Sequence, residues 1–258
     1  MAIIKKFRIK SFKEQETLLE LVKISMFYNK RQILNNLNLK INRQEVIGML
    51  GPNGVGKSTI FHIITGLKDP SFGKVLINGI DCTNLPIYER TTKFKLGYVP
   101  QYGGFIQDLS LIKNLELVAE INIKSKEKRI LKLEKIISQF EFEPLIRIKA
   151  KHLSGGQKKK LVISMALINE PKILLLDEPF AALDILTIKM LQEIIVSLQS
   201  LEKITVVVCD HQARDLLSCV DRAIVLSNGK VIASGGPSEI IKDSIARSAY
   251  FGDEFKIN

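Results

Sequence analysis

The chain contains no long apolar segment. Among its 258 residues, no uncharged run approaches the roughly 18 apolar residues that a membrane-spanning helix needs. The first residues, MAIIKKFRIKSFKEQE, carry a charge every few positions, so they lack the apolar centre of a secretory signal peptide. We therefore expect a protein of the cytoplasm.

The sequence is also poor in cysteine. Its three cysteines, Cys82, Cys209 and Cys219, lie far apart and form no C-x-x-C pair. This spacing argues against a disulfide framework or a zinc site and fits a reducing compartment. We expect all three to be small residues of the hydrophobic core.

Acidic residues are too few to balance the basic ones: 38 Lys and Arg against 27 Asp and Glu give a net charge of +11. Such a charge fits a nucleic-acid ligand, an anionic membrane surface or simply a lysine-rich surface. The densest basic segment, KSKEKRILKLEKI (124–136), together with the residue after it, has apolar residues at helical spacing in Ile130, Leu133 and Ile137. This pattern favours one solvated helix face over a nucleic-acid-binding stripe.

Strands and helices alternate along most of the chain. After a polar lead-in (1–17), the segments LLELVKISMFY and ILNNLNLKI alternate as the strands of a half-buried sheet do. The segments EVIGML, KILLLDEP and ITVVVCD are short apolar runs, typical of buried strands. Helices are expected at 57–67, 187–200 and 212–219. This order predicts an α/β core with a mostly parallel sheet.

Two further regions differ from this core. Residues 101–152 give no strand signal and are rich in Leu, Ile, Lys and Glu, so we expect an inserted helical lobe. The segment RAIVLSNGKVIAS predicts a hairpin that turns at Asn228-Gly229. A C-terminal helix and tail (236–258) complete the domain 18–258.

The segment GPNGVGKST matches the pattern G-x-x-x-x-G-K-[ST] and lies between a predicted strand and a predicted helix. Glycines allow successive backbone N–H groups to converge on a phosphate, and the helix N-terminus adds its positive dipole. The lysine supplies a charge for the β- and γ-phosphates, and the serine hydroxyl can reach Mg²⁺. We expect this loop to bind ATP through Gly51, Pro52, Asn53, Gly54, Gly56, Lys57, Ser58 and Thr59.

Two carboxylates, Asp177 and Glu178, end the apolar run KILLLDEP. Ligands of open parallel sheets bind at the carboxyl ends of the strands, so both side chains should face the phosphates. Adjacent residues of an extended strand point in opposite directions, so we expect their roles to differ. We assign Asp177 to Mg²⁺, together with Ser58, and Glu178 to the attacking water.

A second phosphate-binding helix start is predicted at HLSGGQKKKLVISMAL. Ser154 and two glycines precede apolar residues that include Leu161 and Ile163, which indicates a capped helix with exposed amides. One chain has no evident use for two such sites around one γ-phosphate. A symmetric dimer resolves this, because the second site of each chain can close over the ATP of the other.

The segments GPNGVGKST, LSGGQ, ILLLDEP and CDH, in this order, resemble the ATP-binding subunits of ABC transporters over residues 18–258. The resemblance implies an α/β P-loop ABC ATPase core: a mostly parallel sheet, an antiparallel N-terminal β-subdomain and an inserted helical lobe. It implies an active ATPase that uses ATP and Mg²⁺ as a homodimer. Its expected partners are two transmembrane permease subunits and the inner membrane surface, with no specific nucleic acid. The chain itself is expected in the cytoplasm, peripheral on the cytoplasmic face of the inner membrane.

Further site residues follow from this resemblance alone. Tyr28 matches the aromatic residue that stacks on adenine, and Gln101 matches the glutamine that senses Mg²⁺ and contacts the membrane partner. Asp184 matches the aspartate at the dimer interface, and His211 matches the switch histidine that contacts the γ-phosphate. The second phosphate site comprises Ser154, Gly155, Gly156 and Gln157. The expected catalytic set is Lys57, Gln101, Glu178 and His211, with Ser58, Gln101 and Asp177 for the metal.

The transported substrate is a separate question. The segments PNGVGKSTIFHIITGL, LLLDEPFAALD and YFGDEF together resemble the ATPase of the lipopolysaccharide exporter of Gram-negative bacteria. In FIQDL, however, Ile106, Gln107 and Asp108 stand where that family typically has an aromatic residue followed by arginines. After the LSGGQ segment, three lysines (158–160) stand where arginines are common; lysine keeps the charge but lacks the planar, forked guanidinium group of arginine. Two alternatives stay open: an importer ATPase for branched-chain amino acids, and a soluble ABC ATPase that acts on DNA or ribosomes.

Overall fold

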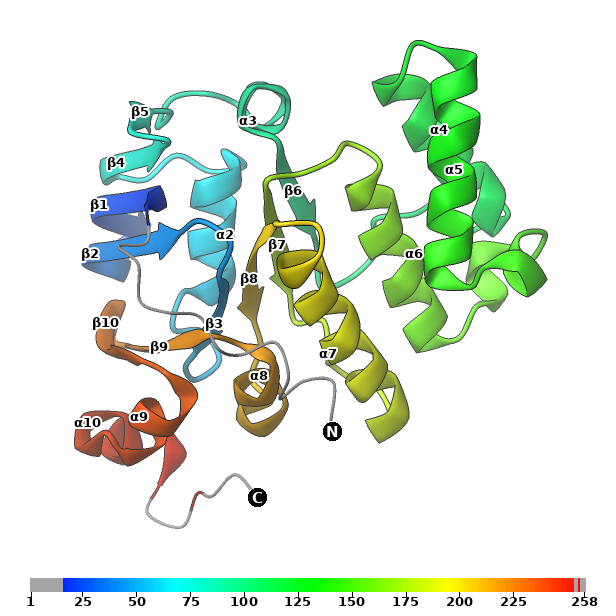
Figure 1. Ribbon diagram of the computed structural model, residues 1–258. Helices are drawn as coiled ribbons and strands as arrows, with labels where there is room; N and C mark the ends of the chain where they lie inside the picture. Colours follow the sequence, from blue (N-terminus) through cyan, green and yellow to red (C-terminus); the bar gives the residue numbers. More distant parts are fainter. Residues whose placement is uncertain (1–15, 253–254, 256–258) are drawn as a thin grey trace.

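The computed structural model describes residues 16–252 and 255, so most of the predicted lead-in, and Asp253 and Glu254 of the tail, lie outside the described residues. The described chain forms two β-sheets flanked by helices (Figure 1). The first is an antiparallel sheet in the order β2-β1-β4-β5. Its strands are β1 (Thr17–Tyr28), β2 (Arg31–Asn42), β4 (Phe72–Ile77) and β5 (Ile80–Asp81).

The second sheet has the order β10-β9-β3-β8-β7-β6 and is parallel except for the edge strand β10. Its strands are β3 (Val46–Leu50), β6 (Leu96–Val99), β7 (Ile173–Asp177), β8 (Thr205–Cys209), β9 (Arg222–Ser227) and β10 (Lys230–Gly235). Asn228 and Gly229 both have positive φ between β9 and β10, which confirms the predicted turn. The sequence-based fold class, a mostly parallel sheet with an antiparallel N-terminal sheet, is therefore confirmed.

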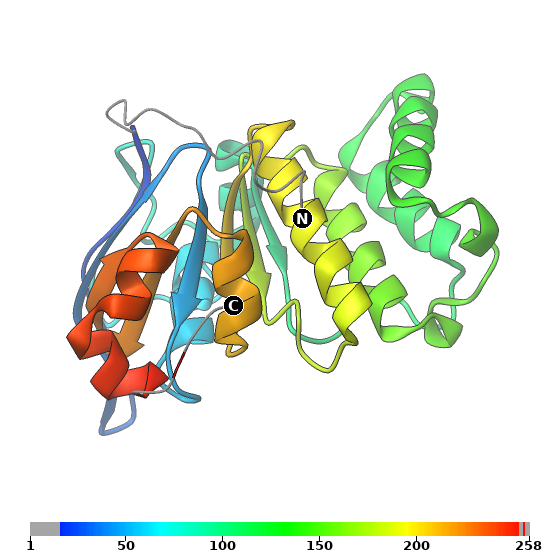
Figure 2. The same cartoon turned by 60° about the horizontal axis from the view of Figure 1, so that its bottom comes forward.

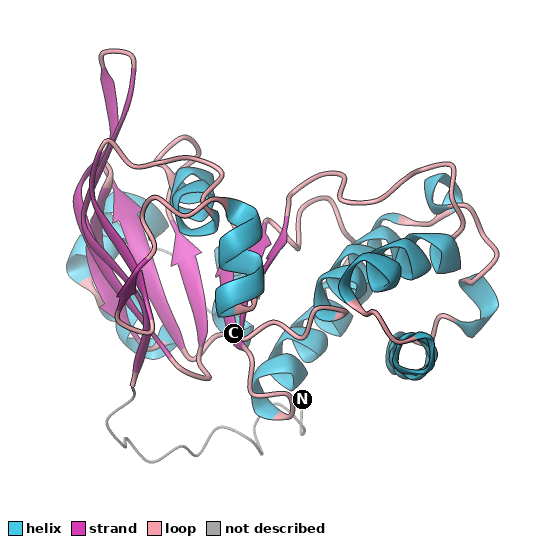
Figure 3. Cartoon of the chain, turned by 90° about the horizontal axis from the view of Figure 1, so that it is seen from above, coloured by secondary structure: helices cyan, strands magenta, loops and turns pink. Residues whose placement is uncertain are grey.

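Helices cover both faces of the parallel sheet. Helix α2 lies between the two sheets, and α6, α7 and α8 pack on the opposite face. Helices α4 and α5 lie apart from the strands, as Figures 1 and 3 show. The bounds are α2 (Lys57–Thr65), α3 (Ile87–Phe94), α4 (Leu111–Asn122), α5 (Lys126–Phe140), α6 (Gly155–Leu167), α7 (Ile185–Ser200) and α8 (Ala213–Cys219).

The C-terminal segment contains α9 (Pro237–Lys242), α10 (Ser244–Ala246) and a π-helical turn, η3 (Arg247–Phe251). It packs beside β9 and β10, as Figure 2 shows in red. The predicted single C-terminal helix is thus interrupted at Asp243, whose side chain caps α10. No helix in the described part of the chain is long and apolar enough to cross a membrane.

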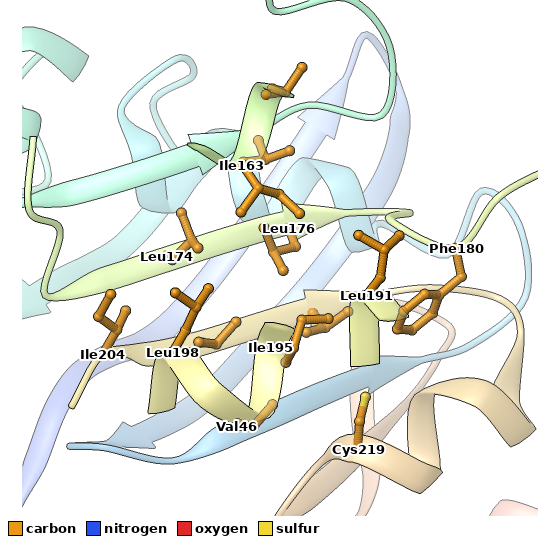
Figure 4. Close-up of a cluster of buried hydrophobic side chains, with 14 of the residues drawn as sticks. Val46, Ile163, Leu174, Leu176, Phe180, Leu191, Ile195, Leu198, Ile204 and Cys219 are labelled. Atoms are coloured by element: carbon orange, nitrogen blue, oxygen red, sulfur yellow. The ribbon is translucent and has the colours of Figure 1, made fainter. Parts of the chain in front are cut away.

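The alternation of side chains along β7 explains why its run is apolar throughout. Ile173 and Leu175 face α2 and the antiparallel sheet, whereas Leu174 and Leu176 face α6 and α7. Figure 4 shows the second pair among Ile163 of α6 and the leucines of α7. Cys82, Cys209 and Cys219 are all buried and free, which confirms their prediction as core residues.

Two local predictions were incomplete. Helix α2 ends at Thr65 and not at residue 67, because Gly66 takes a left-handed conformation that closes the helix. Helix α3 was not among the predicted helices; it buries Phe94 and, completely, Arg90. Its guanidinium donates to four backbone carbonyls, those of Ile63, Ile64, Thr83 and Leu85. A residue expected at the surface thus ties α3 to the C-terminal end of α2.

Candidate active site

The strand order brings the predicted site residues to one edge of the parallel sheet. Strands β3, β8, β7 and β6 are adjacent and parallel, so their carboxyl ends meet. The glycine-rich loop follows β3, His211 follows β8, Glu178 follows β7 and Gln101 follows β6. Four segments that are distant in sequence therefore surround one site at the carboxyl edge of the sheet.

The glycine-rich loop requires a glycine where α2 begins. Gly56 has φ of 110°, and a Cβ atom there would lie 2.7 Å from Cδ2 of Leu34. Among the described residues, no side chain caps α2, whereas α4, α5, α6 and α7 begin with capping residues Ser110, Ser125, Ser154 and Asp184. The first amides of α2 lack intrahelical partners, so they are available to an anion.

Lys57 lies against this loop. Its side chain is only 6% exposed, and Nζ donates to the carbonyls of Gly51 at 2.7 Å and Pro52 at 3.1 Å. The ammonium group is therefore held over the loop and not in solvent. It provides the positive charge that a triphosphate needs at this position.

A cavity of about 310 Å³ opens beside the loop. Tyr28 lines one part of it, and Glu178 lines another. Nζ of Lys68 lies 4.5 Å from the centre of the Tyr28 ring. The lining comprises Tyr28, Ile33, Asn53, Gly54, Gly56, Lys57, Ser58, Thr59 and Glu178. An aromatic ring and a phosphate-binding loop on one cavity suit the two ends of a nucleotide.

Asp177 faces the start of α2. The Ser58 hydroxyl donates to its Oδ1 atom at 3.3 Å, and the Tyr98 hydroxyl donates to Oδ2 at 3.4 Å. A hydroxyl and a carboxylate are the oxygen ligands that Mg²⁺ takes, with waters completing its shell. These two residues therefore fit the metal; when bound, it would neutralise phosphate charge.

Sequence reasoning missed Tyr98. Burial, with the charge of Asp177 adding to it, raises the pKa of the Tyr98 hydroxyl, so the hydroxyl stays protonated and donates. Its ring packs edge-on against Phe61 and His62 of α2. The only signal in the sequence was its position near the end of a predicted strand.

Glu178 lies just past the end of β7. Its φ is 45°, so the backbone turns there and leaves the extended conformation. The expectation that strand alternation separates Asp177 from Glu178 was therefore wrong: this turn separates them. Gln101 Nε2 donates to Oε2 of Glu178 at 2.6 Å, and Nδ1 of His211 lies 3.5 Å from the same oxygen.

Asp210 is a second residue that the sequence reasoning did not assign. It is fully buried, and its carboxylate accepts from the backbone N–H of Phe180 at 3.0 Å and of Gln212 at 2.9 Å. The Gln212 side chain returns a hydrogen bond to the Phe180 carbonyl at 2.9 Å. Together they fasten the segment after Glu178 to the segment that carries His211.

Lys159 is one of the lysines that stand in place of common arginines. Its Nζ donates to the backbone carbonyl of Gln101 at 2.8 Å. Burial lowers the pKa of Lys159, while the charges of Asp210, Asp177 and Glu178 act to raise it. This lysine thus connects α6 to Gln101 and faces the same carboxylates.

The second predicted phosphate site begins α6. The Ser154 hydroxyl accepts from the Gln157 N–H at 3.2 Å, and the Gln157 side chain accepts from the Ser154 N–H at 2.8 Å. This capping box leaves the amides at Gly155 and Gly156 for another acceptor. None of these four residues is among the described lining of the cavity at Lys57. Within one chain, the structure does not bring the two sites together.

Asp184 caps α7 beside this second site. Its Oδ1 atom accepts from the Thr187 N–H at 3.0 Å, and Oδ2 accepts from the Thr187 hydroxyl at 2.6 Å. These bonds lower the pKa of the Asp184 carboxyl, so the residue is charged. Asp184 is exposed, so a partner molecule can reach it.

Gly156 is required by the close approach of α7. A Cβ atom at this position would lie 2.4 Å from Cγ2 of Thr187. We predict that Gly156→Ala lowers the free energy of unfolding by about 1–3 kcal/mol, since neither helix can easily move away. Chemical denaturation followed by circular dichroism measures this change.

Thr187→Ser in the same chain provides the matched rescue. It removes the clashing methyl group but keeps the hydroxyl and the N–H that Asp184 binds. We expect the double variant to regain most of the lost stability and Thr187→Ser alone to resemble the original protein. If Thr187→Ser restores nothing, the contact with Thr187 is not the reason for glycine here.

Comparison with known proteins agrees with this geometry. The profile of the ABC transporter family matches residues 34–181. The chain is 35% identical over 240 residues to the lipopolysaccharide export system ATP-binding protein LptB of Acidithiobacillus ferridurans, covering 93% of this chain and 99% of the relative.

Solved structures give the same result. An ATP-binding cassette of an ABC transporter superposes with a TM-score of 0.83 at 26% identity, over 92% of this chain and 99% of the cassette. A dimeric ATP-binding cassette in a post-hydrolysis state, bound to ADP and Pi, superposes with a TM-score of 0.75 at 30% identity, over 85% and 99%.

Proposed function

The chain belongs to the ABC transporter family and is an ATP-hydrolysing cassette, and from this premise we propose that it powers lipopolysaccharide export. One observation of the site carries the ATPase assignment: the Glu178 carboxylate lines the cavity of the phosphate-binding loop, accepts from Gln101 and has His211 Nδ1 3.5 Å away. The substrate rests on the similarity to LptB over nearly the full length of both chains.

Each residue of the site has a separate part in the proposed reaction. Lys57 and the first amides of α2 hold the phosphates, and Tyr28 stacks on the adenine. Ser58, Asp177 and Gln101 would hold Mg²⁺. Gln101 and His211 orient Glu178, which accepts a proton from the attacking water. The catalytic effect is mainly positioning and charge neutralisation.

The proposed reaction takes place between two copies of the chain. The helix start at Ser154 lies outside the cavity of its own chain, and Asp184 is exposed beside it. We propose that these groups close over the ATP of the partner copy, as the dimeric state of a related cassette supports. ATP then joins the two copies, and loss of its γ-phosphate releases them.

The surface near Gln101 is the proposed contact for two permease subunits at the cytoplasmic face of the inner membrane. Tyr102 is 79% exposed and Ile106 is 48% exposed, beside the site glutamine. The fully buried Asn114 fixes this loop, because its side chain accepts from the Ile106 N–H at 2.7 Å. Asp108 forms an ion pair with Lys151 at 2.7 Å and is thus already engaged within the chain.

The proposed function can be tested by purification from solubilised membranes. We expect two permease subunits to co-purify, and lipopolysaccharide to raise the ATPase rate of the reconstituted complex several-fold. The same complex without lipopolysaccharide is the control. Stimulation by branched-chain amino acids would assign an importer instead. Stimulation of the isolated chain by DNA or ribosomes, with no permease recovered, would overturn the transport function.

A further inference from the structure

The C-terminal tail contacts the segment that carries the predicted switch histidine. The hydroxyl of Tyr250, in the turn η3, donates to the backbone carbonyl of His211 at 3.0 Å, across 39 positions of sequence. The Tyr250 ring packs against Phe251 at 5.1 Å between ring centres, and Phe251 packs against Phe255 at 4.7 Å. The guanidinium of Arg214, in α8, lies 5.7 Å from the centre of the Phe255 ring.

His211 needs such an anchor because its own side chain is loosely held. The imidazole is 45% exposed, and its Nδ1 atom lies 3.5 Å from Glu178 and 3.7 Å from Asp210. Both distances are longer than the roughly 2.7–3.2 Å of an ordinary N–H···O hydrogen bond. Its backbone, in contrast, is fixed: the carbonyl accepts from the Ala213 N–H at 3.0 Å and from Tyr250. The backbone therefore determines where the imidazole points.

The Tyr250 hydroxyl is suited to this contact. Burial, with the charge of Asp210 adding to it, raises the pKa of Tyr250 to about 12, while a backbone hydrogen bond of Gly51 acts to lower it. The hydroxyl therefore stays protonated and can donate at neutral pH. The Gly51 contact also places it beside the first residue of the phosphate-binding loop.

Packing around this hydrogen bond is open. A cavity of about 500 Å³ lies between the tail and the start of α8, lined by His211 and Tyr250 among others. Close packing therefore does not fix the segment of His211 from this side. The hydrogen bond from the Tyr250 hydroxyl to the His211 carbonyl is the specific contact between the tail and this segment.

We propose that Tyr250 is a positioning residue for ATP hydrolysis. Its hydroxyl fixes the backbone of His211 and thereby aims the imidazole at Glu178 and the γ-phosphate. The C-terminal turn thus forms part of the hydrolytic machinery, although it lies after GPNGVGKST, LSGGQ, ILLLDEP and CDH in the sequence. This inference rests on the proposed role of His211.

The test is Tyr250→Phe, which removes the hydroxyl and keeps the ring. We expect kcat for ATP to fall about fivefold, as loss of one hydrogen bond implies, with KM for ATP and the unfolding midpoint unchanged. Tyr88→Phe is the matched control, because Tyr88 is 69% exposed on α3, and it should change neither constant. An unchanged kcat, or a fall in kcat explained by a lower unfolding midpoint, would overturn the proposal.

A double-mutant cycle separates positioning through His211 from other effects. We expect His211→Ala alone to lower kcat by about 10²-fold, and the added Tyr250→Phe to lower it no further. A further fivefold loss in the double variant would show that Tyr250 acts elsewhere. If His211→Ala itself hydrolyses ATP normally, the assigned role of His211 fails, and this result is distinct from a failure at Tyr250 alone.

Discussion

Glu178→Gln is expected to slow ATP hydrolysis by about 10²- to 10⁴-fold and to leave ATP bound. The amide cannot accept the proton of the attacking water. Its carbonyl oxygen can still accept the hydrogen bond from Gln101 that Glu178 Oε2 accepts at 2.6 Å. Lys57 and the amides of α2 are unchanged, so phosphate binding persists.

The variant should therefore remain in the ATP-bound dimer. Sedimentation with ATP and Mg²⁺ measures this as a species of twice the chain mass, which disappears when ATP is omitted. Glu134→Gln, on the exposed face of α5, is the matched control and should hydrolyse ATP normally. Normal hydrolysis by Glu178→Gln would show that another group accepts the proton.

Mixing two inactive variants, Lys57→Met and Ser154→Arg, is expected to restore ATPase activity. Lys57→Met removes the charge over the phosphate loop, and Ser154→Arg fills the helix start that faces the partner copy. Each variant alone should lose about 10²-fold or more in rate, because each of its dimers has two damaged sites. In the mixed dimer one site contains both damaged halves and the other is intact.

Random pairing gives mixed dimers in half of the population, so about a quarter of all sites should be intact in an equimolar mixture. A coupled ATPase assay of the mixture against each parent measures this recovery. Mixing Lys57→Met with the double variant Lys57→Met/Ser154→Arg is the control and should restore nothing, because every loop remains damaged. If Ser154→Arg alone hydrolyses ATP at the full rate, the signature helix has no part in the site.

The sequence predicted the elements that local chemistry determines. The glycine-rich loop occurs between β3 and α2 as expected, because Gly56 takes a backbone conformation that other residues rarely adopt. The apolar run before Asp177 forms a central strand. Helices cover both faces of the sheet, so the residues that point to either face must be buried. The hairpin turn could be predicted from two residues, Asn228 and Gly229, because both readily adopt the positive φ that this turn requires.

The family resemblance added Gln101 and His211, which spacing alone would not have selected. The structure places both side chains at Glu178, so residues from three segments meet there. The position of Glu178 relative to Asp177 could not be predicted, because the backbone turn that separates them depends on the contact of the Glu178 N–H with the Cys209 carbonyl at 2.7 Å.

By itself, the sequence determined the loop, the apolar strands and the capped helix start at Ser154, because each depends on residues within a few positions of one another. It also determined the family, because several such short motifs occur in the family's order. Only the tertiary structure decided which partners Tyr98, Asp210 and Tyr250 have. The hydrogen bonds Tyr98–Asp177, Phe180–Asp210 and Tyr250–His211 each join residues at least 30 positions apart. Such partners follow from the strand order β3-β8-β7-β6 and from where the C-terminal turn packs, and long-range packing fixes both.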